Sequence, residues 1–227
     1  MSITPSKLTR AAGISAAVAG AIYIAVQIHH PAMNVHSVMT HDWVVRQTAK
    51  VIMAALALAG ITGMYLRQVR ETRKLGLVGY MVFAIGYLLM LATECIGAFV
   101  LPGLAHSSPG YVNNVVVASF GGTPTHSIGG LETLFAFAGL GYMVGGLLFG
   151  IAMFRARILS RWAAALLAVG ALSTVALKWL PQSFNRPMAV PVGVALIGLG
   201  ASLWRDQRNT VSEISPSVTP LDHAIAS

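Results

Sequence analysis

One acidic residue, Glu94, interrupts the otherwise apolar stretch YLLMLATECIGAFVLPGL. A carboxyl group that is removed from water holds its proton more readily and can pass it to a bound substrate, so Glu94 is a candidate proton donor. If the stretch is a helix, Glu94 lies roughly 10 Å below its outer end, and Lys50 lies at the same depth in the preceding apolar segment. The alternative is therefore an ion pair between Glu94 and Lys50 that joins two helices, and such a pair favours the carboxylate over the acid.

Aromatic residues precede Glu94 at steps of three and four, which places them on one helical face. This predicted face holds Tyr80, Phe83, Tyr87 and Met90. A second face is predicted to begin at Glu132 and to continue through Phe135, Gly139 and Tyr142. Aromatic rings attract cations, so acids above aromatic walls suit chemistry that makes a carbocation from an apolar chain. The same spacing is also typical of helix packing alone.

These residues receive the following predicted roles. Glu94 and Glu132 are the candidate catalytic acids, and Glu132 becomes the better donor if Glu94 is paired. Lys50 and Arg46 are candidate supporting residues. The candidate substrate-binding residues are the aromatic ones: Tyr80, Phe83, Tyr87, Phe135 and Tyr142.

The composition indicates a membrane protein. Of the 227 residues, 56% are hydrophobic and only 10% are charged, whereas a soluble domain carries about 25% charged residues. In a soluble chain the formal charge of +8 would suggest a nucleic-acid partner. In a membrane protein, excess positive charge is first explained by the basic residues that fix the orientation of the spans. We therefore predict no nucleic-acid partner.

Six apolar runs are long enough for helices that cross a hydrocarbon core of about 30 Å. The predicted spans are Ala11–Ile28, Val44–Leu66, Leu75–Leu101, Leu131–Phe154, Trp162–Leu180 and Met188–Trp204. The sequence thus predicts an all-α polytopic membrane bundle over residues 11–208, preceded by a cytoplasmic N-terminus (1–10) and followed by a disordered cytoplasmic tail (209–227). The first span resembles a signal peptide, but five more spans follow it, so we expect it to be retained.

Basic residues concentrate on one side of the predicted bundle. Four fall on the other side: Arg46, Lys50, Lys178 and Arg186. The remaining eleven flank the ends that share a compartment: Lys7, Arg10, Arg67, Arg70, Arg73, Lys74, Arg155, Arg157, Arg161, Arg205 and Arg208. The positive-inside rule then places both termini in the cytoplasm of a multi-pass protein of the cell membrane.

Histidines gather in the outer loops without the spacing of a metal site. Pro31 follows His29 and His30 directly, so no helix holds His30 and His36 in register. We therefore predict no metal and no cofactor, and we expect solvated or capping histidines. Cys95 is the only cysteine, which excludes an internal disulfide. The second outer loop, residues 102–130, is rich in Gly, Ser and Pro, and such a loop can fold back as a lid.

Several segments together resemble small actinobacterial integral-membrane proteins, in particular the membrane terpene cyclases of drimentine-type indole sesquiterpenoid biosynthesis. These segments are VIMAALALAGITGMYLRQVR, GYLLMLATECIGAFVLPGLA, SPGYVNNVVVASFGGTPTHSIGGLETL and GGLLFGIAMFRARILSRWAAALLAVGAL. The resemblance covers residues 10–205 and implies a metal-independent, protonation-initiated cyclisation of a farnesylated indole. The chain has no DDxxD or DxDD motif, which excludes a soluble-type terpene synthase.

Two functions are therefore expected. The first is a membrane-embedded cyclase that takes a lipophilic prenylated substrate from the lipid bilayer. The second is a non-enzymatic transporter or binding protein for a small lipophilic or cationic solute. Small residues within the spans, as in GLGYMVGGLLFG, would let the helices approach closely and rock. The oligomeric state is left open.

Overall fold

The computed structural model describes residues 4–176 and 187–214, and it describes side chains for residues 4–173 and 187–206. Within these ranges the chain forms helices and no strand, which confirms the all-α class. The helices are α1 (Pro5–Ala25), α2 (Val35–Val38), α3 (His41–Arg67), α4 (Val69–Cys95), α5 (Leu101–Leu104), α6 (Pro109–Ser119), α7 (Leu131–Ala156), α8 (Arg161–Ala176) and α9 (Val190–Ile214). A π-helical turn, Ile96–Val100, joins α4 to α5, and a 3₁₀ turn, Pro187–Ala189, precedes α9.

Within the part of the chain that the structure describes, five helical segments are long and apolar enough to cross a membrane. They are Pro5–Ala25, His41–Arg67, Val69–Leu104, Leu131–Ala156 and Pro187–Asp206. The helix at the fifth predicted span, α8, is apolar but shorter, with 16 described residues. Its predicted end at Leu180 lies outside the described residues, as do Lys178, Trp179 and Arg186.

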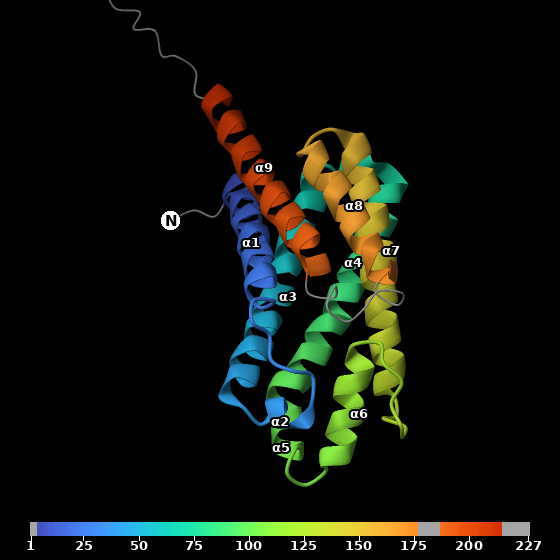
Figure 1. The fold of residues 1–227 in the computed structure, drawn as a ribbon. Coiled ribbons are helices and arrows are strands. Elements are labelled where there is room, and N and C mark those ends of the chain that lie inside the picture. Colours follow the sequence, from blue (N-terminus) through green and yellow to red (C-terminus); the bar gives the residue numbers. More distant parts are fainter. Residues whose placement is uncertain (1–3, 177–186, 215–227) are drawn as a thin grey trace, which may run out of the picture.

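The long helices form a closed ring in chain order. α1 packs against α3, α3 against α4, α4 against α7, α7 against α8 and α8 against α9, and α9 returns to pack against α1. Figure 1 shows α1 and α9 side by side, with α4, α7 and α8 forming the opposite part of the bundle. Residues far apart in the sequence therefore face one another inside this ring.

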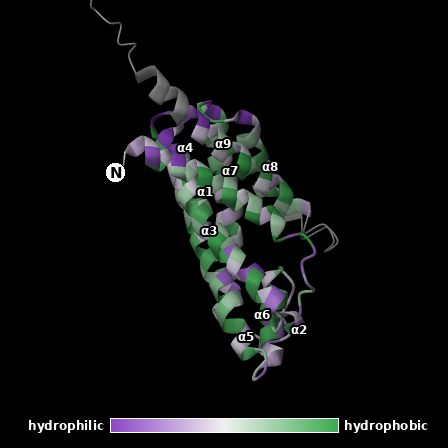
Figure 2. Cartoon of the chain, turned by 90° about the vertical axis from the view of Figure 1, so that its left-hand side faces the viewer, coloured by the Kyte–Doolittle hydropathy of each residue, from purple (hydrophilic) through white to green (hydrophobic). Residues whose placement is uncertain are grey.

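The two ends of the bundle differ in composition. We call the end that holds the start of α1 and the α3–α4 and α7–α8 turns the basic end, because Lys7, Arg10, Arg67, Arg155 and Arg161 lie in these segments. Figure 2 shows hydrophobic residues along most of the helix length and a concentration of hydrophilic residues at this end. This arrangement agrees with the predicted charge asymmetry.

The opposite, outer end is closed by helices that the sequence did not predict. α2 packs against α6, and α6 packs against α5 and α7. Val38, Val112, Val116 and Ile128 are buried there in a second apolar cluster, separate from the main core. Residues 102–130 therefore hold an ordered cap that includes α6, because YVNNVVVAS can bury its valines against α2 and α7.

Both ends of the chain are more helical than predicted. Thr4 caps α1 by accepting a hydrogen bond from the Lys7 backbone N–H, so this helix begins at Pro5 rather than near Ala11. α9 continues to Ile214 and so includes the start of the segment predicted to be disordered. Residues 215–227 lie outside the described residues.

Candidate functional site

The predicted inner face of α4 is present. Phe83 and Tyr87 are 0% and 2% exposed in the main core. Tyr80 and Met90 are partly buried against the same core. The face continues to Glu94, whose side chain is 19% exposed. The helical period alone was sufficient to predict this face.

Four aromatic residues, which we call the aromatic cluster, fill the contact between α4 and α7: Phe83, Tyr87, Tyr142 and Phe149. The Phe83 ring centroid lies 4.9 Å from that of Tyr87 and 5.5 Å from that of Tyr142. The Tyr87 and Tyr142 rings meet edge to face at 5.6 Å. These are favourable separations for aromatic pairs, so the cluster is a packed part of the core.

Close approach of the two backbones makes this packing possible. A Cβ atom at Gly145 of α7 would collide with the backbone of Phe83, and one at Gly86 of α4 would collide with the backbone of Tyr142.

Tyr80 lies beyond the cluster, where its ring stacks on Tyr65 at 4.6 Å. Its hydroxyl lies 3.1 Å from that of Thr62.

Glu94 and Lys50 form the predicted ion pair. Lys50 Nζ lies 3.8 Å from Glu94 Oε2, and the Lys50 side chain is 12% exposed. The Gln47 side chain, one turn earlier on α3, also lies beside Glu94. Because α3 and α4 are antiparallel neighbours, residues at equal depth in the two predicted spans come into contact, which is why the sequence predicted this pair.

Tyrosine hydroxyl groups extend this polar region toward α1 and α7. The Tyr142 hydroxyl donates to the Tyr23 hydroxyl at 3.4 Å. The Tyr87 ring contacts the Tyr142 ring, and Tyr23 lies close to Glu94. The sequence analysis missed Tyr23, because its place depends on α1 facing α7 across the ring, and no local spacing encodes that.

The π-helical turn Ile96–Val100 begins two residues after Glu94. Trp43 donates from its indole Nε1 to the carbonyl of Gly97 at 3.0 Å. A Cβ atom at Gly97 would collide with Nε2 of Gln47. The absence of a side chain at Gly97 therefore makes room for Gln47. π-helical turns occur frequently at functional sites. The sequence analysis missed Gln47 as well, although it shares the spacing of Trp43 and Lys50 on α3.

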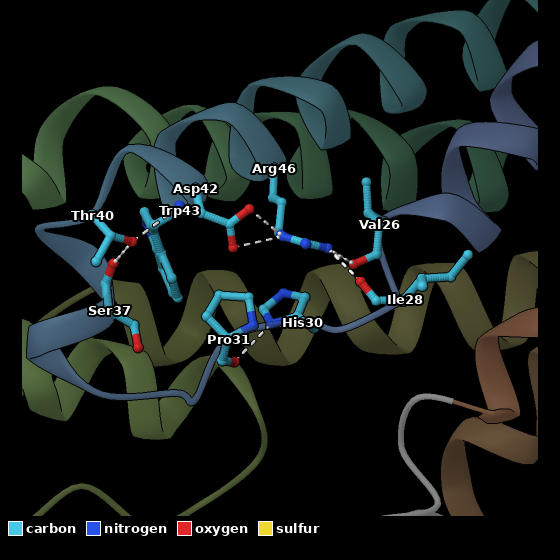
Figure 3. A network of polar contacts seen from close by, with 9 residues as sticks. All are labelled: Val26, Ile28, His30, Pro31, Ser37, Thr40, Asp42, Trp43 and Arg46. Carbon is cyan, nitrogen blue, oxygen red and sulfur yellow. Dashed lines mark hydrogen bonds and ion pairs between the residues drawn. The ribbon is translucent and has the colours of Figure 1, made fainter.

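Arg46 stabilises the junction between α1 and α3 (Figure 3). Its Nε pairs with both carboxylate oxygens of Asp42 at 2.9 Å, and its Nη1 donates to the carbonyls of Val26 and Ile28. Figure 3 also shows His30 beside Trp43, with the two rings 6.4 Å apart and nearly perpendicular. Arg46 therefore binds carbonyl groups at the C-terminal end of α1, and none of its described contacts is with Glu94.

The structure does not bring Glu132 to the aromatic cluster. Glu132 is exposed in the first turn of α7, where its Oε1 accepts a hydrogen bond from the Ile128 backbone N–H at 3.3 Å. Phe135 packs against the outer apolar cluster. The inward face of α7 instead passes through Ala138, Tyr142 and Phe149. Ten residues separate Glu132 from Tyr142, so at 1.5 Å per residue Glu132 lies roughly 15 Å from Tyr142 along the helix axis.

The outer histidines have ordinary local contacts. His30 Nδ1 lies 2.9 Å from the Pro31 carbonyl, and His126 Nδ1 lies 3.1 Å from the Thr125 hydroxyl. Among the described residues, no three His, Cys, Asp or Glu side chains are grouped so that they could hold a metal ion.

The arrangement as a whole places an ion pair, Glu94 with Lys50, and the aromatic cluster on neighbouring parts of one apolar bundle. A carboxyl group there can give up or receive a proton, and the rings can stabilise a cation. In comparisons with family models, curated proteins and solved structures, nothing matches this chain.

Proposed function

We propose that this chain is a membrane-embedded terpene cyclase, and that Glu94 is the acid that starts the reaction. The observation that carries the proposal is the position of Glu94 on the same helical face as Phe83 and Tyr87, with a side chain that is only 19% exposed. The substrate class is a prenylated, lipophilic molecule of the farnesyl-indole type, which would reach the site from the bilayer. The basic end would face the cytoplasm of the cell membrane, following the positive-inside rule.

The reaction is an isomerisation without redox change. The Glu94 carboxyl group transfers its proton to the terminal alkene of the prenyl chain, and the π electrons of that bond form the new C–H bond. The resulting tertiary cation is attacked by the next alkene of the chain, which closes a ring and moves the cation inward. Loss of a proton from the last cation, or from the indole after it has attacked, returns one proton to the Glu94 carboxylate.

The surroundings of Glu94 suit both halves of this cycle. The Gln47 amide, beside Glu94, can donate a hydrogen bond to the carboxylate that remains after Glu94 has given its proton to the alkene. The rings of Tyr87 and Tyr142, which meet edge to face, are the aromatic groups that would stabilise the developing cation. Before the reaction, transfer of the Lys50 proton to Glu94 converts the ion pair into a neutral carboxylic acid and a neutral amine, and an apolar substrate favours these neutral forms because it removes water from the pair.

The second candidate, a non-enzymatic carrier or binding protein for a small solute, has one observation in its favour. α1 and α9 meet along small residues, where a Cβ atom on Gly20 would collide with the backbone of Gly193. Contacts between small residues let membrane helices approach closely and can permit one helix to slide on another.

One experiment separates the two functions. Purified protein in liposomes is incubated with farnesyl-indole, and the extracted material is analysed by chromatography and mass spectrometry. A cyclase gives a product of unchanged mass and altered retention time. Recovery of unmodified substrate only, together with counterflow of that substrate across the liposome membrane, would support the carrier instead.

A further inference from the structure

A hollow of about 450 Å³ lies at the basic end, between the α7–α8 turn and α9. Its lining includes Ser160, Trp162, Gly198, Arg205 and Asp206. A Cβ atom at Gly198 would lie 2.6 Å from the edge of the Trp162 ring, so the missing side chain lets this ring lie over α9. The hollow therefore has an indole wall, polar groups from the turn and a basic residue at its rim.

Arg205 and Asp206 are the two charged residues that line the hollow. Asp206 pairs with Arg67 through two contacts, so its charge is compensated from outside the hollow. Arg205 is exposed and takes part in no ion pair among those of the described side chains. Arg161, next to the hollow, lies over the Phe154 ring at 4.4 Å from its centroid. An anionic group in the hollow would meet the Arg205 guanidinium, while the Asp206 carboxylate is held by Arg67.

An exposed apolar surface continues from the hollow along α8. Trp162 is 59% exposed, Val169 is 66% exposed and Leu172 is 48% exposed. Steps of seven and three residues place these side chains on one helical face. In a chain that spans the membrane, this face meets the acyl chains, and the hollow lies where that face reaches the basic end.

We infer that the hollow between α8 and α9 binds the head group of an anionic phospholipid. The phosphate is held by the Arg205 guanidinium and the Ser160 hydroxyl, and one acyl chain lies along Trp162, Val169 and Leu172. A lipid is the occupant, rather than free phosphate, because the polar and apolar parts of the site are continuous. This site is independent of the Glu94 site and of any chemistry there.

The test is binding of dioleoyl-phosphatidylglycerol to the purified full-length protein in detergent, followed by native mass spectrometry with dioleoyl-phosphatidylcholine as competitor. We expect one phosphatidylglycerol to be retained in preference to phosphatidylcholine. Arg205→Gln should weaken this binding about fivefold, which is the effect of one basic residue near an anionic surface. Lys74→Gln is the matched control, because it removes one exposed charge on α4, a helix that does not line the hollow.

Equal losses in Arg205→Gln and Lys74→Gln would overturn the site in favour of a diffuse charge effect. Displacement of the lipid by inorganic phosphate at the same concentration would assign the hollow to a free anion instead. Ala201→Leu fills the hollow without changing the charge and keeps the test decisive if Arg205→Gln does not fold. It should weaken phosphatidylglycerol binding by a similar factor, and unchanged binding would contradict the proposal.

Discussion

Glu94 and Lys50 are each other's ionic partners in a region with little water, so neither can be changed alone without consequence. Glu94→Gln keeps the volume of the side chain but leaves the Lys50 ammonium, whose side chain is 12% exposed, without its countercharge. The expected loss of unfolding free energy is about 3–5 kcal/mol. Thermal unfolding in detergent measures this loss.

The double variant Glu94→Gln, Lys50→Met separates stability from chemistry. It removes both charges together, so the unfolding temperature should return close to that of the wild type. Turnover of farnesyl-indole should stay roughly 10²–10⁴-fold below the wild-type rate, because a positioned acid supplies that factor. A stable double variant with full turnover would reduce Glu94 to a structural partner of Lys50.

Glu132 is predicted to act differently, although it is also an acid near the outer end of a helix. It is exposed and accepts one hydrogen bond from the Ile128 backbone. Glu132→Gln keeps an acceptor oxygen, so stability should change by less than about 0.5 kcal/mol and turnover should stay near the wild-type rate. Loss of turnover in a folded Glu132→Gln protein would move the donor role from Glu94 to Glu132.

At the scale of elements, the contact between α4 and α7 holds the aromatic cluster together. Gly145→Ala would push a methyl group into the Phe83 backbone. Such overpacking should destabilise the bundle by about 1–3 kcal/mol. Gly139→Ala, on the same helix, is the control, because a Cβ atom there meets nothing within 4 Å. Equal unfolding temperatures for the two variants would show that α4 and α7 are not in close backbone contact at Gly145.

How much of these elements could be predicted depends on the range of the interaction. The inner face of α4 and the Glu94–Lys50 pair follow from helical period and equal depth, which are local properties. Tyr23 and Gln47 join the site through contacts between helices and through the turn at Gly97, so spacing within one segment did not reveal them. α6 was missed because its glycine- and proline-rich flanks are typical of a loop, while its valines are buried only against neighbouring helices.

At the scale of the whole molecule, the closed helix ring and the basic end make the membrane topology testable. Reporter fusions at Arg70, His106, Arg157 and the C-terminus should be cytoplasmic, external, cytoplasmic and cytoplasmic, because α4 and α7 connect opposite ends of the bundle. A cytoplasmic reporter at His106 would contradict this topology.

The central claim is that the reaction begins with proton transfer to the substrate, and running it in D₂O tests this step most directly. The exchangeable carboxyl proton of Glu94 becomes deuterium, so the cyclised product should carry one deuterium at the carbon that was the protonated end of the alkene. Mass spectrometry and NMR of the product measure both the number and the position of the label. A cyclised product without deuterium, or complete recovery of unmodified farnesyl-indole, would contradict an acid-initiated cyclase.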